Sequence, residues 1–262
     1  MLKQILLSMS CVVFALPVLA DDAAAEKGKN IAIEADKRGE GFVDTKVSLK
    51  MVLIDKSGAE SVREMRTLAL EGPKEDGDKS LMIFDTPKDQ AGVALLTYTH
   101  KQDADDQWLY LPALKRVKKI ASQNKSGPFV GSEFAFEDIS SQEVEKYTYN
   151  YLREEVLNGE KCFVVERFPL DKNSGYTRQI AWIDQKEYRT LKVDFYDRKN
   201  ELLKTLDNKD FKQYLNKFWR PAVSFMKNHQ TGKATRLEFQ NYEFKVGLDE
   251  KDFTKNSLTR AL

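Results

Sequence analysis

Most of this chain alternates between apolar and polar residues with a period of two. The alternation is clearest in residues 43–53, where Val47, Leu49 and Met51 share one side and polar residues occupy the other. Such a period predicts β-strands that bury one face. The same pattern predicts strands at residues 61–70, 81–84, 93–99, 107–111, 147–157, 162–168, 176–183, 189–196, 201–206, 221–229 and 234–246.

Local signals refine this succession of strands. Asn158-Gly159 is typical of a tight hairpin turn between two of them. In the last strand the apolar phase switches near Gln240–Asn241, which predicts a β-bulge there. The segment 210–219 fits a helix as well as a strand.

A helical pattern is predicted at the start of the chain. In residues 23–37, Ile31, Ala32 and Ala35 lie on one side, and glycines follow the segment. With no recurring helices after it, the chain is expected to be mainly β, an antiparallel meander forming a single domain over residues 21–262. So long a sheet must curl. We expect an incomplete antiparallel β-barrel, a half-barrel whose concave side holds the N-terminal helix, a lid and an apolar cavity.

Residues 1–20 have the features of a signal peptide. Lys3 precedes an apolar run over residues 5–18, and the segment ends in Val18-Leu19-Ala20. The mature chain is then expected to begin at Asp21, in the periplasm. A lipoprotein signal at Cys11 is disfavoured, because neither Leu nor Val stands three residues before that cysteine.

Composition excludes several functional classes. Removing residues 1–20 leaves 41 basic residues (42 less Lys3) against 41 acidic ones, which gives no support for nucleic-acid binding. Cys162 is the sole remaining cysteine, expected to be a buried apolar residue. His100 and His229 have no partners at metal-binding spacing, and no nucleophile elbow or phosphate loop is present. No enzyme activity, cofactor or metal is expected.

The stretch from residue 106 to 139 is the strongest candidate for function. It joins an aromatic strand containing Trp108 and Tyr110 to a basic segment, a polar loop at residues 122–128 and a second aromatic group. We interpret the polar loop as mobile and the second group as a flexible flap over a binding mouth. The basic residues would contact lipid headgroups or an acidic partner, or simply form a solvated strand; they are Lys115, Arg116, Lys118 and Lys119, together called the basic edge below.

Apolar side chains on the predicted inner face and flap are the candidate ligand-binding residues. Each of the aromatics could also be plain core. The set comprises Val47, Leu49, Trp108, Tyr110, Phe129, Phe134, Phe136, Trp182, Val193 and Phe195.

The same stretch carries a family resemblance. WLYLPALKRVKKIASQNKSGPFVGSEFAFEDI, residues 108–139, resembles the signature of LolA-like outer-membrane lipoprotein-sorting proteins, in the branch associated with RND-type lipid exporters. Further matches include NYLREEVLNGEKCFVVE and SGYTRQIAWID. The resemblance implies an incomplete barrel with a helical lid, an acyl-chain cavity and no catalytic residues. Pro128-Phe129-Val130 departs from the small-residue-Phe-Met form expected in that loop.

Three functional hypotheses follow. The first is a periplasmic carrier that takes a lipid or lipoprotein acyl group from an inner-membrane RND-type transporter toward the outer membrane or an acceptor there. The second is a non-catalytic periplasmic adaptor that docks the exporter while its own side chains fill the cavity. The third is a hydrolase acting on lipid or glycan.

Overall fold

The computed structural model describes residues 18–260, so most of the predicted signal peptide lies outside the described residues. Helix α1 (Val18–Gly39) comes first and contains the whole helix predicted at residues 23–37. The strands are β1 (Asp44–Ile54), β2 (Glu60–Leu70), β3 (Lys79–Thr86), β4 (Ala94–Tyr98), β5 (Asp106–Leu111), β6 (Arg116–Lys119), β7 (Tyr147–Leu157), β8 (Glu160–Pro169), β9 (Arg178–Asp184), β10 (Thr190–Tyr196), β11 (Leu202–Lys209), β12 (Lys212–Tyr214), β13 (Phe218–Arg220), β14 (Val223–Asn228) and β15 (Ala234–Phe244).

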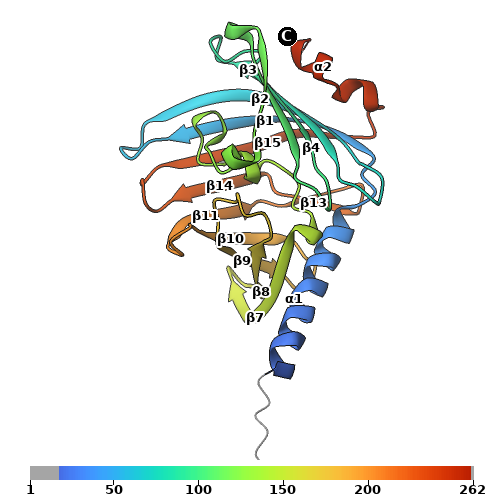
Figure 1. Ribbon diagram of the computed structural model, residues 1–262, viewed down its shortest axis with the longest axis vertical. Coiled ribbons are helices and arrows are strands. Elements are labelled where there is room, and N and C mark those ends of the chain that lie inside the picture. The colour runs from blue at the N-terminus through green and yellow to red at the C-terminus, as the bar shows by residue number, and fades with distance from the viewer. Residues whose placement is uncertain (1–17, 261–262) are drawn as a thin grey trace, which may run out of the picture.

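One antiparallel sheet of thirteen strands dominates the described residues (Figure 1). Its order is β6-β5-β4-β3-β2-β1-β15-β14-β11-β10-β9-β8-β7, so the first and last strands pair in its middle. The strands β6 and β7 follow each other in sequence but form opposite edges of the sheet. The sheet is therefore open, which confirms the expected mainly β, incomplete antiparallel barrel.

Two irregularities follow from the sequence signals. The pairing of β1 with β15 shifts between Lys46 and Ser48, so that Asn241 and Tyr242 both lie opposite Val47, and Asn241 has φ 52°. This is the predicted bulge. The ambiguous segment 210–219 forms most of a small hairpin, β12–β13, rather than a helix.

Apolar residues pack on both faces of the sheet. The main core cluster lies on the concave face and includes Leu49, Met65, Val165 and Met226. On the other face of β3–β5, a second cluster packs against the C-terminal segment, formed by a 3₁₀ turn (Glu250–Phe253) and helix α2 (Lys255–Thr259). Phe253 and Leu258 of this segment are completely buried.

Residues 120–146, called the crossing segment below, connect β6 to β7 across the concave face. Phe129 in this segment is completely buried and packs against Phe84 and Phe136, with ring centroids 5.8 and 5.6 Å away. The buried amide of Gln107 donates to the Phe136 carbonyl at 3.0 Å, and the Arg63 guanidinium donates to the Val130 carbonyl. The aromatic residues interpreted as a flap are therefore part of the core.

Candidate functional site

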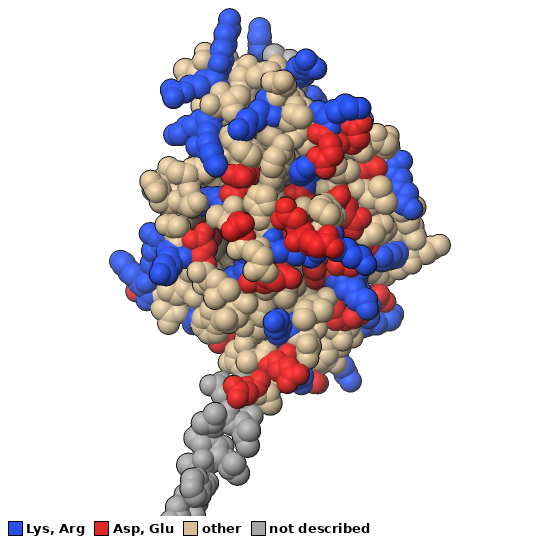
Figure 2. Space-filling model, turned by 45° about the vertical axis from the view of Figure 1, so that its right-hand side comes forward, with Lys and Arg blue, Asp and Glu red and all other residues tan. Residues whose placement is uncertain are grey.

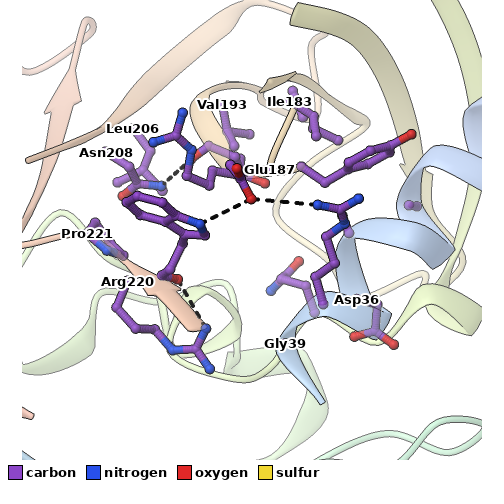
Figure 3. Close-up of a pocket in the computed structure, with 18 of the residues that line it drawn as sticks. Asp36, Gly39, Ile183, Glu187, Val193, Leu206, Asn208, Arg220 and Pro221 are labelled. Atoms are coloured by element: carbon purple, nitrogen blue, oxygen red, sulfur yellow. Dashed lines mark hydrogen bonds and ion pairs between the residues drawn. The ribbon is translucent and has the colours of Figure 1, made fainter. Parts of the chain in front are cut away.

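A cavity of about 660 Å³ lies between α1 and the concave face of the sheet, beside the crossing segment (Figure 3). Three parts of the chain enclose it: α1, strands β7–β11 with β14, and the β12–β13 hairpin. This volume falls within the range of small-molecule binding sites. We call it the helix cavity.

The inner wall of the helix cavity is mainly apolar, although Arg167, Thr190 and Asn208 of the same strands also line it. Successive inward residues of neighbouring strands supply it, since alternate residues of a strand share a face. The wall comprises Val165, Ala181, Ile183, Val193, Phe195, Leu206 and Met226, with Phe134 and Val144 from the crossing segment.

Helix α1 contributes small side chains, Ala32 and Ala35, to the opposite wall. The helix packs along the edge strand β7. Gly28 permits this close approach, because a Cβ at that position would lie 2.9 Å from the backbone nitrogen of Tyr151. The helix thereby covers the β7 edge and closes one side of the cavity.

Charged side chains lie where the helix cavity meets α1 and the hairpin. Glu187 accepts a hydrogen bond from the Trp219 indole at 3.2 Å and pairs with Arg38 at 3.8 Å (Figure 3). Arg189 pairs with the buried carboxylate of Asp184 at 2.8 Å. These contacts join the hairpin, the helix and the turn after β9 into a polar rim. The wall formed by the sheet, across the cavity from this rim, is mainly apolar.

A buried polar network fixes the crossing segment at the base of the helix cavity. The Lys204 ammonium lies 2.6 Å from a carboxylate oxygen of Asp138 and donates to the Glu133 carbonyl at 2.9 Å. Asp138 also accepts from the Tyr176 hydroxyl at 2.8 Å, and burial raises the pKa of that phenol well above its ordinary value. Burial also raises the pKa of Glu137, which accepts from Ser174 and Gly175. These bonds make the segment a fixed part of the cavity.

The structure brings together seven of the ten predicted ligand-binding residues on the concave side. Phe134, Val193 and Phe195 line the helix cavity. Leu49, Phe129 and Phe136 lie in the same core cluster but pack against protein. Val47 is buried in the strand phase of Leu49 and does not line the cavity.

The other three predicted residues lie elsewhere. Trp108 and Tyr110 belong to the cluster under the C-terminal segment, while Leu109 and Leu111 of the same strand face the main core. Trp182 packs with Cys162 and Val164, whereas its neighbours Ala181 and Ile183 line the helix cavity. The prediction that these three residues line the cavity was wrong. Both faces of their strands are apolar, so the alternation of residues alone did not identify the face that points toward the cavity.

The basic edge is exposed along β6 at one border of the sheet. Figure 2 shows Lys and Arg side chains gathered at the end of the molecule where β6 lies. Lys119 pairs with Asp106 at 2.7 Å, and its ammonium and that of Lys255 lie 5.8 and 4.6 Å from the Trp108 ring. Such cations on an open edge also disfavour pairing with another strand.

Sequence reasoning missed the hairpin and the turn after β9 as parts of the site. Glu187, Lys217, Trp219 and Arg220 line the helix cavity, yet they lie in segments whose pattern shows only turns or an ambiguous element. The aromatic and basic residues that adjoin each other around Trp219 were the signal in the sequence that could have identified the hairpin as part of the site. Among the described residues, no cluster of acidic, histidine or cysteine side chains could hold a metal, and no helix is long and apolar enough to cross a membrane.

Several solved structures resemble this chain in both sequence and fold. A Vibrio parahaemolyticus domain, provisionally named as an outer membrane lipoprotein-sorting protein, is 55% identical, with a TM-score of 0.88 over 90% of this chain and 100% of that chain. A DUF1329 family protein from Desulfovibrio piger is 27% identical, with a TM-score of 0.85 over 90% of this chain and 99% of its own. A LolA superfamily protein from Nitrosomonas europaea, 22% identical over 88% and 98% of the two chains, shares the fold with a TM-score of 0.71.

Two further comparisons complete the assignment. A sequence family described only as an uncharacterized protein matches residues 76–260, and no curated protein matches the chain. The 55% identity spans nine tenths of this chain and all of the Vibrio domain. The chain therefore belongs to the same family as the Vibrio outer membrane lipoprotein-sorting protein domain, and it has the LolA-like fold.

Proposed function

We propose that this protein is a periplasmic carrier that binds the acyl chain of a lipid or lipoprotein in the helix cavity. The observation that carries the proposal is this cavity of about 660 Å³, mainly apolar on its sheet side and polar where it meets α1 and the hairpin. Each buried methylene contributes about 0.8 kcal/mol to affinity. The lipoprotein-sorting name of the Vibrio relative supports the same class of cargo.

The direction of transfer rests on the family resemblance. The carrier would accept cargo from an inner-membrane transporter of the RND type and release it at the outer membrane. The basic edge would dock an acidic surface of the transporter, since exposed, clustered cations increase the association rate with an oppositely charged partner. It lies on β6, at the border of the sheet opposite the helix-covered β7, so cargo binding and docking use different surfaces.

Filling the helix cavity tests the carrier proposal. Replacing Ala32 with Trp puts an indole into the space between α1 and the sheet and should reduce affinity for a fluorescent fatty acid at least tenfold. The matched control is Ala25→Trp, two turns earlier on the same face of the helix but exposed and outside the cavity, which should bind like the wild type. Circular dichroism checks that both variants fold. Equal probe affinity in the folded Ala32 variant and the wild type would place the ligand elsewhere.

A second candidate, the non-catalytic adaptor, is favoured by one observation. The crossing segment fills part of the concave face with its own aromatic residues, as a self-filled cavity requires. Native mass spectrometry of the protein purified from its own periplasm separates the two functions. A bound lipid supports the carrier, and its identity names the cargo; a lipid-free protein that still binds the transporter supports the adaptor.

A further inference from the structure

The Arg220 side chain, at the edge of the helix cavity, has few partners of its own. It is half buried, and burial lowers the pKa of its guanidinium. Its contacts are one hydrogen bond to the Trp219 main-chain oxygen at 3.1 Å and a Phe218 ring centred 5.5 Å away. No carboxylate of the described residues lies within ion-pair distance; Tyr242 and, more weakly, Asp78 act on the charge of Arg220 from farther away. A guanidinium carries five N–H donors, so most of these have no protein acceptor.

The other cavity-lining cations differ in their surroundings. Arg38 pairs with Glu34 at 2.8 Å and with Glu187, and Arg189 pairs with Asp184 and Glu160. Arg167 and Lys217 have no carboxylate partner either. Arg167 donates to the Gln179 side-chain oxygen at 2.7 Å, and Lys217, on the same hairpin as Arg220, donates to the Glu40 carbonyl just after α1. The hairpin therefore presents two cations that form no ion pair with a described carboxylate, in the lining of a cavity whose sheet side is mainly apolar.

A mainly apolar wall next to a partly desolvated, unpaired guanidinium matches an amphiphile. We infer that the helix cavity selects lipids with an anionic head group, a phosphate or a carboxylate, which Arg220 binds with its forked donors while the acyl chain lies along the sheet. Planar guanidinium groups bind these anions through two parallel hydrogen bonds. This inference rests on the proposed carrier function and specifies its ligand.

The test compares a fluorescent fatty acid with its methyl ester, which has the same chain and no charge. The wild type should bind the acid at least tenfold more tightly, as expected for a charge-assisted hydrogen bond in a partly desolvated site. Arg220→Met should lose about tenfold in affinity for the acid and stay within twofold for the ester. Arg220→Lys, which keeps the charge but not the fork, should lie between. Arg236→Met is the matched control, because Arg236 pairs with Glu60 and Glu238 away from the cavity.

Each outcome has a distinct meaning. Failure of the wild type to bind either probe would overturn the carrier proposal itself. Binding of both probes with equal affinity, unchanged in Arg220→Met, would overturn only the head-group inference. An equal loss for both probes in Arg220→Met would show that Arg220 merely holds the hairpin. Inorganic phosphate is added alone as a further arm: heat stabilisation through Arg220 at millimolar phosphate would indicate a free-anion site and contradict the lipid assignment.

Discussion

Replacing Lys204 with Met tests whether the crossing segment is fixed in place by a buried ion pair. Only 5% of the Lys204 side chain and 6% of the Asp138 side chain are exposed, and the two charged groups lie 2.6 Å apart. The methionine keeps the length and apolar stem of the lysine. It removes the ammonium, together with its bond to the Glu133 carbonyl.

The expected cost follows from the burial of Asp138. Its carboxylate still accepts from the Tyr176 hydroxyl and the Ala135 N–H, but no cation remains beside this largely buried group. Removing one member of a buried pair costs about 3–5 kcal/mol. A domain is typically stable by about 5–15 kcal/mol, so the variant should lose a large fraction of its stability.

Urea unfolding followed by tryptophan fluorescence gives the free energy of unfolding for each variant. The double variant Lys204→Met, Asp138→Leu should be more stable than the sum of the two single losses predicts, because it leaves no unpaired charge. Lys46→Met is the matched control. Its ammonium lies 3.9 Å from Glu243 and is 47% exposed, so its loss should change stability by no more than about 0.5 kcal/mol.

Two results would refute this reasoning. A cost below about 1 kcal/mol for Lys204→Met would mean that water reaches the pair in solution. Strictly additive losses in the double variant would mean that Lys204 and Asp138 stabilise the fold independently. Either result would remove the basis for treating the crossing segment as a fixed wall of the helix cavity.

Three further predictions concern the crossing segment and the basic edge. Phe129→Ala should cost about 3–5 kcal/mol in urea unfolding, because the ring is completely buried; a loss below about 1 kcal/mol would instead indicate the flexible flap. Glu137 has a folded pKa raised above its ordinary 4.5, so its ionisation destabilises the fold at neutral pH and its protonation stabilises it as the pH falls toward 4.5. Glu137→Gln should therefore be most stable relative to the wild type at neutral pH, and a pH-independent difference between the two unfolding curves would contradict this. Replacing all four residues of the basic edge with Glu should abolish pull-down of the inner-membrane transporter and leave fatty-acid affinity unchanged; retained pull-down would make these cations a solvated strand.

The placement of most strands depends on local pattern, so the sequence predicts them; the β12–β13 hairpin, in a segment that also fits a helix, is an exception. Residues 43–53 alternate because one face of β1 packs on the core, so the period of two is present in the residues themselves. The bulge at Asn241 is visible for the same reason, as a change of phase within one strand. Cys162 is completely buried, as its apolar neighbours indicate.

The site depended on tertiary structure. Trp108 and Leu109 are both apolar, and only the packing of the C-terminal segment on one face shows which of them points outward. The aromatic residues of the crossing segment became core because the open sheet places its two edges on opposite sides, so the connection between them must cross the concave face. The helix cavity joins Ala32, Val193 and Arg220, which are far apart in the chain. Periodicity records what each residue's immediate neighbours require, whereas a cavity is the space that distant elements leave unfilled when they pack together.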